Sequence, residues 1–311
     1  LTMEIAGERG VSVDEDQFAK FMNDQRERAR AARAAMGDLG WEGDVLQGIP
    51  GNTEFVGYTD KTCTAKVAAI IKDGALADEI DEGESGIIVL DRTCFYGEGG
   101  GQVGDSGILF GANSTFQVLD TKKSVNSHFM HIGEMKAGMI RVGDELTAEI
   151  DSLRRDSIMR NHSACHLLQA ALREVLGTHV HQSGSYVDEN LCRFDFSHFS
   201  AMTSDEIARV ENIVNDMILA ALPVTVETMS QDEAKAKGAM ALFGEKYGDA
   251  VRVVDMGGRS IELCGGTHVD NTSRVGLFKI VKESSIAAGV RRIEAVTGRG
   301  VLGLIDADRH L

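Results

Sequence analysis

This sequence of 311 residues has little proline, no long apolar stretch and no ordered set of cysteines. Its two prolines stand beside 35 glycines, so we expect the chain to change direction in tight glycine turns. No run of about 18 apolar residues occurs, and we therefore expect no membrane span. The five cysteines are odd in number and scattered, which argues against a secreted disulfide framework and favours reduced thiols in the cytoplasm.

Positive charge is scarce as well, because 32 Lys and Arg stand against 48 Asp and Glu, for a formal net charge of −16. A protein that binds nucleic acid alone and without specificity is usually basic, since phosphate contacts dominate its affinity. The charge argues against such a protein, but not against a domain that other modules hold near the end of an RNA. Local arginines could then serve the phosphates, namely Arg154, Arg155, Arg160, Arg291 and Arg292.

The beginning of the chain, at Leu1, resembles neither an initiator methionine nor a signal sequence, and we expect a piece of a longer protein. Residues 14–36 are predicted to form one helix, because Asp14 and Gln17 have the spacing of a capping box before an apolar stripe. Glycines follow this helix. We therefore assign residues 1–50 to the end of a helical region and a linker.

Residues 51–150 are predicted to form a small antiparallel, β-barrel-like subdomain. Short β-rich runs alternate there with clusters of Gly, Asp and Asn. The strands that we expect are 65–71, 86–90, 115–119, 129–132 and 145–150.

Residues 151–311 mix helices and strands. A helical period runs from Ser152 to Leu176 and ends at Gly177, and two capping boxes open later helices, the first of which is expected to reach Leu222. The expected strands are a hairpin over 186–196 and single strands over 224–227, 251–255, 260–264, 276–282 and 291–296. Without a regular βαβ rhythm, the fold class is α+β.

Two segments of residues 151–311 carry candidate metal ligands. His162 and His166 lie four residues apart in the long helix, so both rings are on one face, although such a pair is more often ordinary polar surface. Cys264 and His268 flank two glycines after a predicted strand and complete a Cys-His₃ set, which suits tetrahedral Zn²⁺. Ser163 stands where a metalloprotease helix carries its glutamate base, which argues against peptide hydrolysis.

The segments that hold these ligands resemble the paired zinc motifs of the alanyl-tRNA synthetase editing domain. The resemblance covers nearly the whole chain, and the two zinc motifs in this order are its most specific part. The segments that carry it are 160–168 and 264–268, the glycine-rich stretch 95–105, and the stretches 177–185 and 191–196.

This resemblance implies a zinc-containing editing core that hydrolyses tRNA(Ala) wrongly charged with serine or glycine. It implies that His162, His166, Cys264 and His268 hold Zn²⁺ and that the 3′ acceptor end of the tRNA is the partner. It places Gln182 in the editing pocket, against the substrate or a water. Cys165 stands where the family commonly has threonine; a thiol is a weaker donor, and Cys165 could instead be a small buried apolar residue.

The same resemblance implies that residues 1–50 end the tRNA-recognising region of a synthetase. The remaining domains of that chain would attach alanine to tRNA(Ala) using ATP. Three alternatives stay open: a free-standing deacylase of this family, a threonine-type editing module, and a non-catalytic tRNA-binding module stabilised by zinc. The last one stays open because four protein ligands usually mark a structural zinc site.

Overall fold

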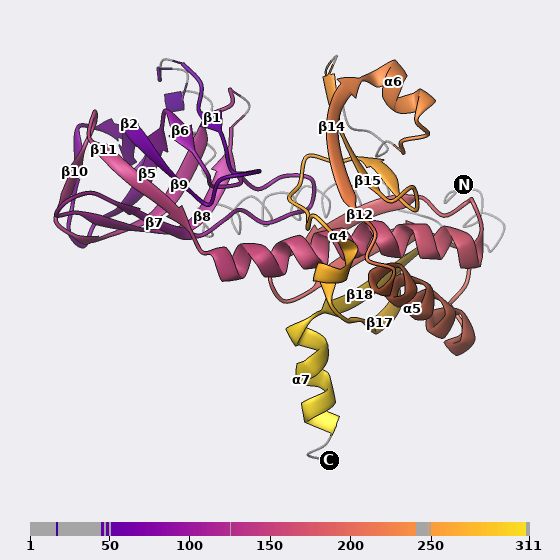
Figure 1. The fold of residues 1–311 in the computed structure, drawn as a ribbon. Coiled ribbons are helices and arrows are strands. Elements are labelled where there is room, and N and C mark those ends of the chain that lie inside the picture. The colour runs from indigo at the N-terminus through magenta and orange to yellow at the C-terminus, as the bar shows by residue number, and fades with distance from the viewer. Residues whose placement is uncertain are drawn as a thin grey trace.

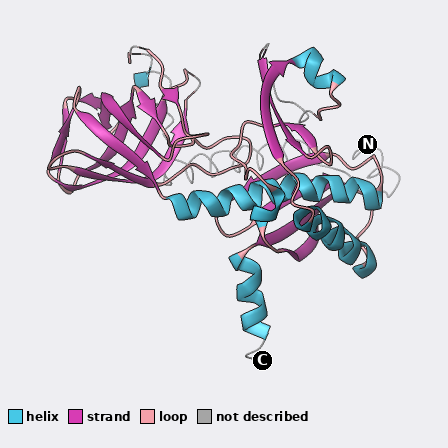
Figure 2. Ribbon diagram, viewed as in Figure 1, coloured by secondary structure: helices cyan, strands magenta, loops and turns pink. Residues whose placement is uncertain are grey.

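The computed structural model describes residues 17, 45, 46, 48, 49, 51–124, 126–240, 248 and 250–308. A β-barrel is joined by one long helix to a mixed unit of sheets and helices (Figures 1 and 2). The expected α+β class is confirmed, with four α-helices in the described part of the chain. The helix predicted over 14–36 lies outside the described residues, apart from Gln17.

Six antiparallel strands form the barrel, and it is closed because its last strand pairs with its first. Inward-facing side chains such as Val67, Leu109 and Phe116 fill its interior. The strands in barrel order are β11 (Glu145–Ile150), β7 (Gly107–Phe110), β8 (Thr115–Lys123), β9 (Phe129–Ala137), β5 (Ser85–Leu90) and β2 (Thr62–Lys72). The predicted barrel is therefore confirmed, but β7 was missed because four residues between glycines carry little pattern.

Several short strands lie outside the closed ring of six. One of them extends the sheet beyond β2, and the others form two separate pairs. They are β3 (Ala75–Ala77), the pair β4 (Glu79–Asp81) with β10 (Met139–Arg141), and the parallel pair β1 (Glu54–Phe55) with β6 (Arg92–Thr93).

The long helix α4 (Ser152–Leu176) has the bounds that the sequence predicts. Its N-cap Asp151 accepts the Arg154 N–H, and its C-cap Gly177 has a φ of 114°, a value that favours glycine. Figure 1 shows α4 running from the barrel into the middle of the second unit. No helix in the described residues is both long and apolar enough to cross a membrane.

Two antiparallel sheets and the remaining helices surround α4. The larger sheet has the order β12 (Gln182–Val187), β13 (Cys192–Ser197), β18 (Val290–Thr297) and β17 (Phe278–Ala287). The smaller has the order β14 (Val224–Ser230), β15 (Ala250–Met256) and β16 (Ile261–Leu263). The helical elements are α5 (Ser204–Leu219), α6 (Gln231–Ala236), a 3₁₀ turn η1 (Thr272–Val275) and α7 (Arg299–Asp308).

The structure corrects the predicted end of α5. This helix stops at Leu219, not at Leu222, because Ala221 adopts a left-handed φ of 51°. The Leu222 N–H then leaves the helical pattern and donates to Thr272 Oγ1 at 2.8 Å. Pro223 cannot donate to a helix at all, so the chain turns directly into β14.

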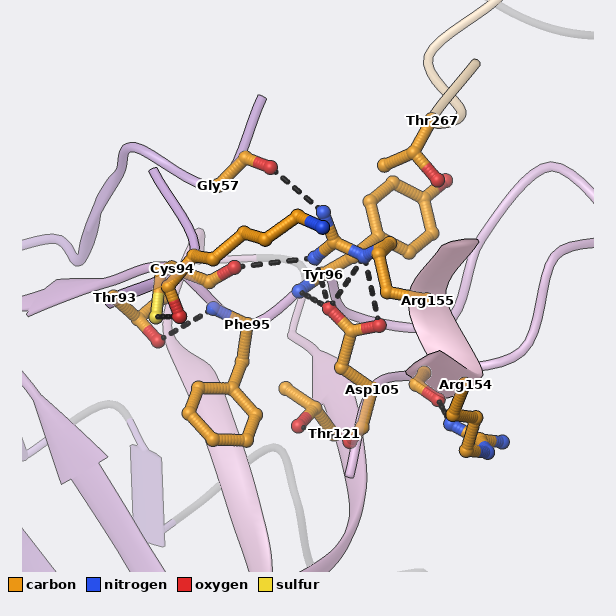
Figure 3. Close-up of polar contacts among 12 residues, drawn as sticks. Gly57, Thr93, Cys94, Phe95, Tyr96, Asp105, Thr121, Arg154, Arg155 and Thr267 are labelled. Carbon is orange, nitrogen blue, oxygen red and sulfur yellow. Dashed lines mark hydrogen bonds and ion pairs between the residues drawn. The ribbon is translucent and has the colours of Figure 1, made fainter. Parts of the chain in front are cut away.

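Arg155, near the start of α4, ties the helix to the barrel through a buried network (Figure 3). Its guanidinium pairs with the Asp105 carboxylate, with Nε 2.9 Å from Oδ1 and 3.0 Å from Oδ2. It also donates to the carbonyl oxygens of Gly57 and Cys94, at 2.8 and 3.2 Å. Because this side chain is enclosed, the expectation that Arg155 serves RNA phosphates is wrong.

Replacement of Arg155 by Met is expected to lower the free energy of unfolding by about 3–5 kcal/mol, because Asp105 stays buried without its cation. Arg154→Met is the matched control. Arg154 pairs with the half-exposed Glu189 at 3.1 Å and donates to Gly104 O at 2.7 Å, and the loss of these two contacts should cost about 1–2 kcal/mol. Urea denaturation followed by circular dichroism measures both, and equal losses would contradict the role of Arg155.

Candidate metal centre

The middle of α4 is fully buried and yet carries several polar side chains. Every residue from Asn161 to Gln169 is buried. Buried polar groups need hydrogen bonds or a metal, because they have lost their contacts with water. Asn161 is satisfied by the protein, since it donates to Asp188 O at 2.8 Å and accepts from Thr297 Oγ1 at 2.7 Å. The histidines of this stretch face a different environment.

The structure brings the four predicted ligands to one point. One ligand atom from each of His162, His166, Cys264 and His268 lies within 4.8 Å of the others. The Cys264 Sγ is 3.5 Å from His162 Nε2 and 3.3 Å from His268 Nε2. Tetrahedral Zn²⁺ with bonds of about 2.0–2.3 Å requires ligand atoms about 3.3–3.7 Å apart. The donor set therefore fits this ion in its chemistry, and the two distances from the Cys264 sulfur fit its spacing.

The ring nitrogens that face away from this point bind other side chains. His162 Nδ1 donates to Gln102 Oε1 at 2.8 Å, since an amide oxygen only accepts. His268 Nδ1 lies 3.2 Å from Ser163 Oγ. The first contact fixes the tautomer of His162 and leaves its Nε2 with a lone pair for a metal. Ser163, whose place in the helix argues against a metalloprotease, therefore has His268 as its structural partner.

The third histidine has a less regular partner. His166 Nδ1 lies 3.4 Å from Glu262 Oε2, but the geometry does not make a hydrogen bond with any described residue. Burial raises the pKa of Glu262 to about 7, because the carboxylate has lost its hydration. The Ser260 hydroxyl donates to the other oxygen, Oε1, at 2.7 Å.

Burial also sets the charge of the imidazoles. It lowers the pKa of His166 to about 3, and it holds the pKa values of His162 and His268 well below the ordinary 6.5, because the charged ring loses hydration. The three rings are therefore neutral at pH 7. Neutral imidazole is the form that binds a metal.

The 264–268 loop reaches its position by close packing and by a clamp. A Cβ at Gly266 would overlap the His162 ring, so glycine is required there. Arg252 Nη1 donates to the carbonyl oxygens of Cys264 and Gly266, at 2.7 and 2.8 Å. Its guanidinium lies 4.1 Å from the centre of the Tyr58 ring, and the Tyr58 hydroxyl donates to Gly265 O at 2.6 Å.

Three residues of this arrangement were missed by the sequence analysis. Gln102 belongs to the glycine-rich stretch that was singled out, but nothing in the stretch marks it as a partner of His162. Tyr58 lies 207 residues before Gly265, and Arg252 lies 12 residues before Cys264 and reaches its carbonyl oxygen only because β15 pairs with β16. No local pattern could have found them.

A cavity of about 50 Å³ opens beside the four ligands. Gln182, at the start of β12, is half-buried in its wall and donates through Nε2 to Ser185 Oγ at 3.2 Å. Cys165 is buried in the same wall. Its hydrogen bond to Cys192 and its burial raise the pKa of the Cys165 thiol well above the ordinary value, so it stays protonated. Both predicted pocket residues therefore line the cavity, and Cys165 is not a thiolate nucleophile.

The other arginines proposed for phosphates are engaged to different degrees. Arg291 forms two hydrogen bonds with the Glu283 carboxylate, at 2.6 and 2.7 Å. Arg292 does the same with Asp195, at 2.6 and 2.7 Å. These paired ion bridges stabilise the larger sheet and engage both guanidinium groups, which argues against their availability to RNA. Arg160 is half-buried and donates to Ser157 Oγ at 3.1 Å.

The chain is expected to bind one equivalent of Zn²⁺ or Co²⁺ through a thiolate. Cys264→Ser should weaken the affinity by more than about 100-fold and abolish the thiolate-to-Co²⁺ charge-transfer band, because a direct ligand outweighs a supporting contact. Cys63→Ser, which changes a barrel thiol outside the group, is the control. Titration followed by absorption spectroscopy measures both, and a full band in Cys264→Ser would reject this ligand.

Gln102→Leu is expected to weaken metal affinity by about 10–100-fold, because His162 loses the acceptor that fixes its tautomer. Gln117→Leu is the matched control, since Gln117 donates to the barrel carbonyl of Gly107 at 2.8 Å and does not touch the ligands. Competition with a coloured chelator measures the affinities. Equal affinity in the two variants would show that Gln102 does not tune the site.

Two models of known protein families match parts of the chain. The family model described as tRNA synthetases class II (A) matches residues 1–154. The model described as Threonyl and Alanyl tRNA synthetase second additional domain matches residues 251–294, which include Cys264 and His268.

Curated relatives match nearly the whole chain. Alanine–tRNA ligase of Bacillus subtilis (strain 168) is 48% identical over 300 residues, which cover 96% of this chain and 34% of the relative. That of Acetivibrio thermocellus is 49% identical over 313 residues, covering 100% and 36%. That of Neisseria meningitidis is 50% identical over 304 residues, covering 97% and 34%. The chain spans about a third of the length of these relatives, and it belongs to the alanyl-tRNA synthetase family.

Proposed function

We propose that this chain is the editing part of an alanine–tRNA ligase and hydrolyses the ester of Ser-tRNA(Ala) and Gly-tRNA(Ala). The observation that supports it most directly is the buried Cys-His₃ group beside a small cavity. The relatives are alanine–tRNA ligases, which attach an amino acid to tRNA, and the matched second additional domain is common to the threonyl and alanyl synthetases. The same chain would carry the domains that activate alanine with ATP.

Such an activity is needed because binding alone separates alanine poorly from glycine and serine. A pocket that accepts alanine cannot strongly exclude glycine, because one missing methyl group is worth only about 1–3 kcal/mol. It also rejects serine poorly, since serine adds a single hydroxyl. A second site that destroys the wrong ester solves this problem. The cavity beside the ligands is small, at about 50 Å³.

The ligands and the cavity residues would have different roles in this reaction. His162, His166, Cys264 and His268 would hold Zn²⁺, which when bound supplies positive charge for a carbonyl oxygen or a water. Gln182 would orient the amino acid or the attacking water from the cavity wall. The neutral Cys165 thiol shapes the same wall and bears no charge.

A second candidate is a zinc-stabilised module that binds the tRNA end without hydrolysis. The full set of four protein ligands favours it, because tetrahedral sites of this kind are usually structural. A free-standing deacylase is a third candidate, with the same chemistry in a different gene. The cytoplasmic location that the cysteines suggested stays a prediction.

The direct test mixes the metal-loaded chain with Ser-, Gly- and Ala-tRNA(Ala) and follows ester loss. The seryl and glycyl esters are expected to disappear much faster than the alanyl ester. Removal of the metal should abolish hydrolysis while circular dichroism shows a retained fold. Gln182→Ala should lower kcat/KM by about tenfold, the worth of one hydrogen bond. Intact esters on bound tRNA would favour the non-catalytic module instead.

A further inference from the structure

Two of the side chains that line the cavity beside the metal ligands carry a buried atom without a hydrogen-bond partner. Among the described residues, three buried side-chain atoms are unpaired: His166 Nδ1, Gln169 Oε1 and Arg193 Nε. His166 and Gln169 both line this cavity. Native proteins leave few such atoms, and each one requires an explanation such as a bound ligand or a water.

Of the two unpaired atoms, Gln169 Oε1 is the one without a candidate partner nearby. His166 Nδ1 has a carboxylate 3.4 Å away, whereas the Gln169 oxygen has no described donor that compensates its burial. The Gln169 side chain is only 6% exposed, and its Nε2 donates to Met240 Sδ at 3.9 Å, which directs the oxygen away from that sulfur. On α4, Gln169 lies four residues after Cys165 and three after His166, so all three share one face of the helix.

Two other polar side chains of the cavity have partners among the described residues. Gln182 donates to Ser185, and the Cys165 thiol is engaged with Cys192. Of these groups, Gln169 therefore offers a fully buried acceptor that no described residue uses. A ligand that completes it must carry a small donor, and a hydroxyl has the right size for this cavity.

We propose that Gln169 Oε1 accepts a hydrogen bond from the side-chain hydroxyl of a seryl ester and so determines which amino acid the cavity prefers. This inference rests on the proposed editing function. Alanine has no donor with which to replace this bond, so a bound alanyl group leaves the acceptor unpaired. A site built to bind a hydroxyl rejects a ligand that lacks it far more strongly than an apolar pocket rejects an added group. A glycyl group lacks the same side-chain donor, so Gln169 favours serine over both glycine and alanine and plays no part in the choice between those two.

Gln169→Met tests this assignment, because methionine keeps the length of the side chain and removes both polar atoms. Its kcat/KM for Ser-tRNA(Ala) is expected to fall by about tenfold, while that for Gly-tRNA(Ala) changes by less than about twofold. Gln231→Met, at the start of α6, is the matched control and should leave both rates unchanged. A structural role would lower both rates together, and that outcome, like no change in either, would overturn the inference.

Binding separates this inference from the editing function itself. The probes are stable amide analogues of 3′-seryl- and 3′-glycyl-adenosine, titrated calorimetrically into the wild type and Gln169→Met. The substitution should weaken the seryl analogue by about tenfold and leave the glycyl analogue unchanged. If the wild type binds the analogues with this preference but hydrolyses neither ester, the editing function fails and the assignment of Gln169 stands. If the substitution leaves the seryl affinity intact, the assignment fails alone.

Discussion

Five polar side chains lie in the middle of α4, where protein encloses the helix on every side: Asn161, His162, Ser163, His166 and Gln169. A helix so deeply buried is normally apolar all round, because each unpaired polar group costs about 1–3 kcal/mol. The surrounding structure must therefore provide a partner for each of them. Asn161 binds a strand, the histidines meet one another and Cys264, and Gln169 retains an open acceptor. The chemistry of the site follows from this requirement.

The barrel contributes to the site although it supplies no metal ligand. Arg155 and Asp105 hold its glycine-rich stretch against the base of α4 (Figure 3), and the same stretch presents Gln102 to His162. On the other side, the Tyr58 hydroxyl of the barrel binds the loop that carries Cys264. A change in how the barrel packs on α4 would therefore move the ligands themselves. This gives the closed barrel a positioning role in the proposed reaction.

Charge and architecture together suggest how a substrate would arrive. The chain has a net charge of −16, and the arginines expected to bind phosphate are largely engaged, with Arg155, Arg291 and Arg292 each paired to a carboxylate. Such a surface attracts RNA weakly. It suits a domain that receives only the 3′ end of a tRNA while other domains of a longer chain hold the rest. The span of about a third of its relatives agrees with that arrangement.

The sequence by itself determined much of this protein. Capping residues and the period of apolar side chains determined α4 almost to the residue, and the two His/Cys motifs identified all four candidate ligands, because these signals are local. It missed β7 and placed the end of α5 too late, since a four-residue strand and one left-handed residue leave little pattern. Only the tertiary structure decided which arginines are buried, that Gln102, Tyr58 and Arg252 support the ligands, and that Gln169 has no partner. Most of these properties depend on contacts between distant segments, such as those between Arg155 and Asp105, 50 residues apart, and between Tyr58 and Gly265, 207 residues apart. Neighbours along the chain do not encode such contacts.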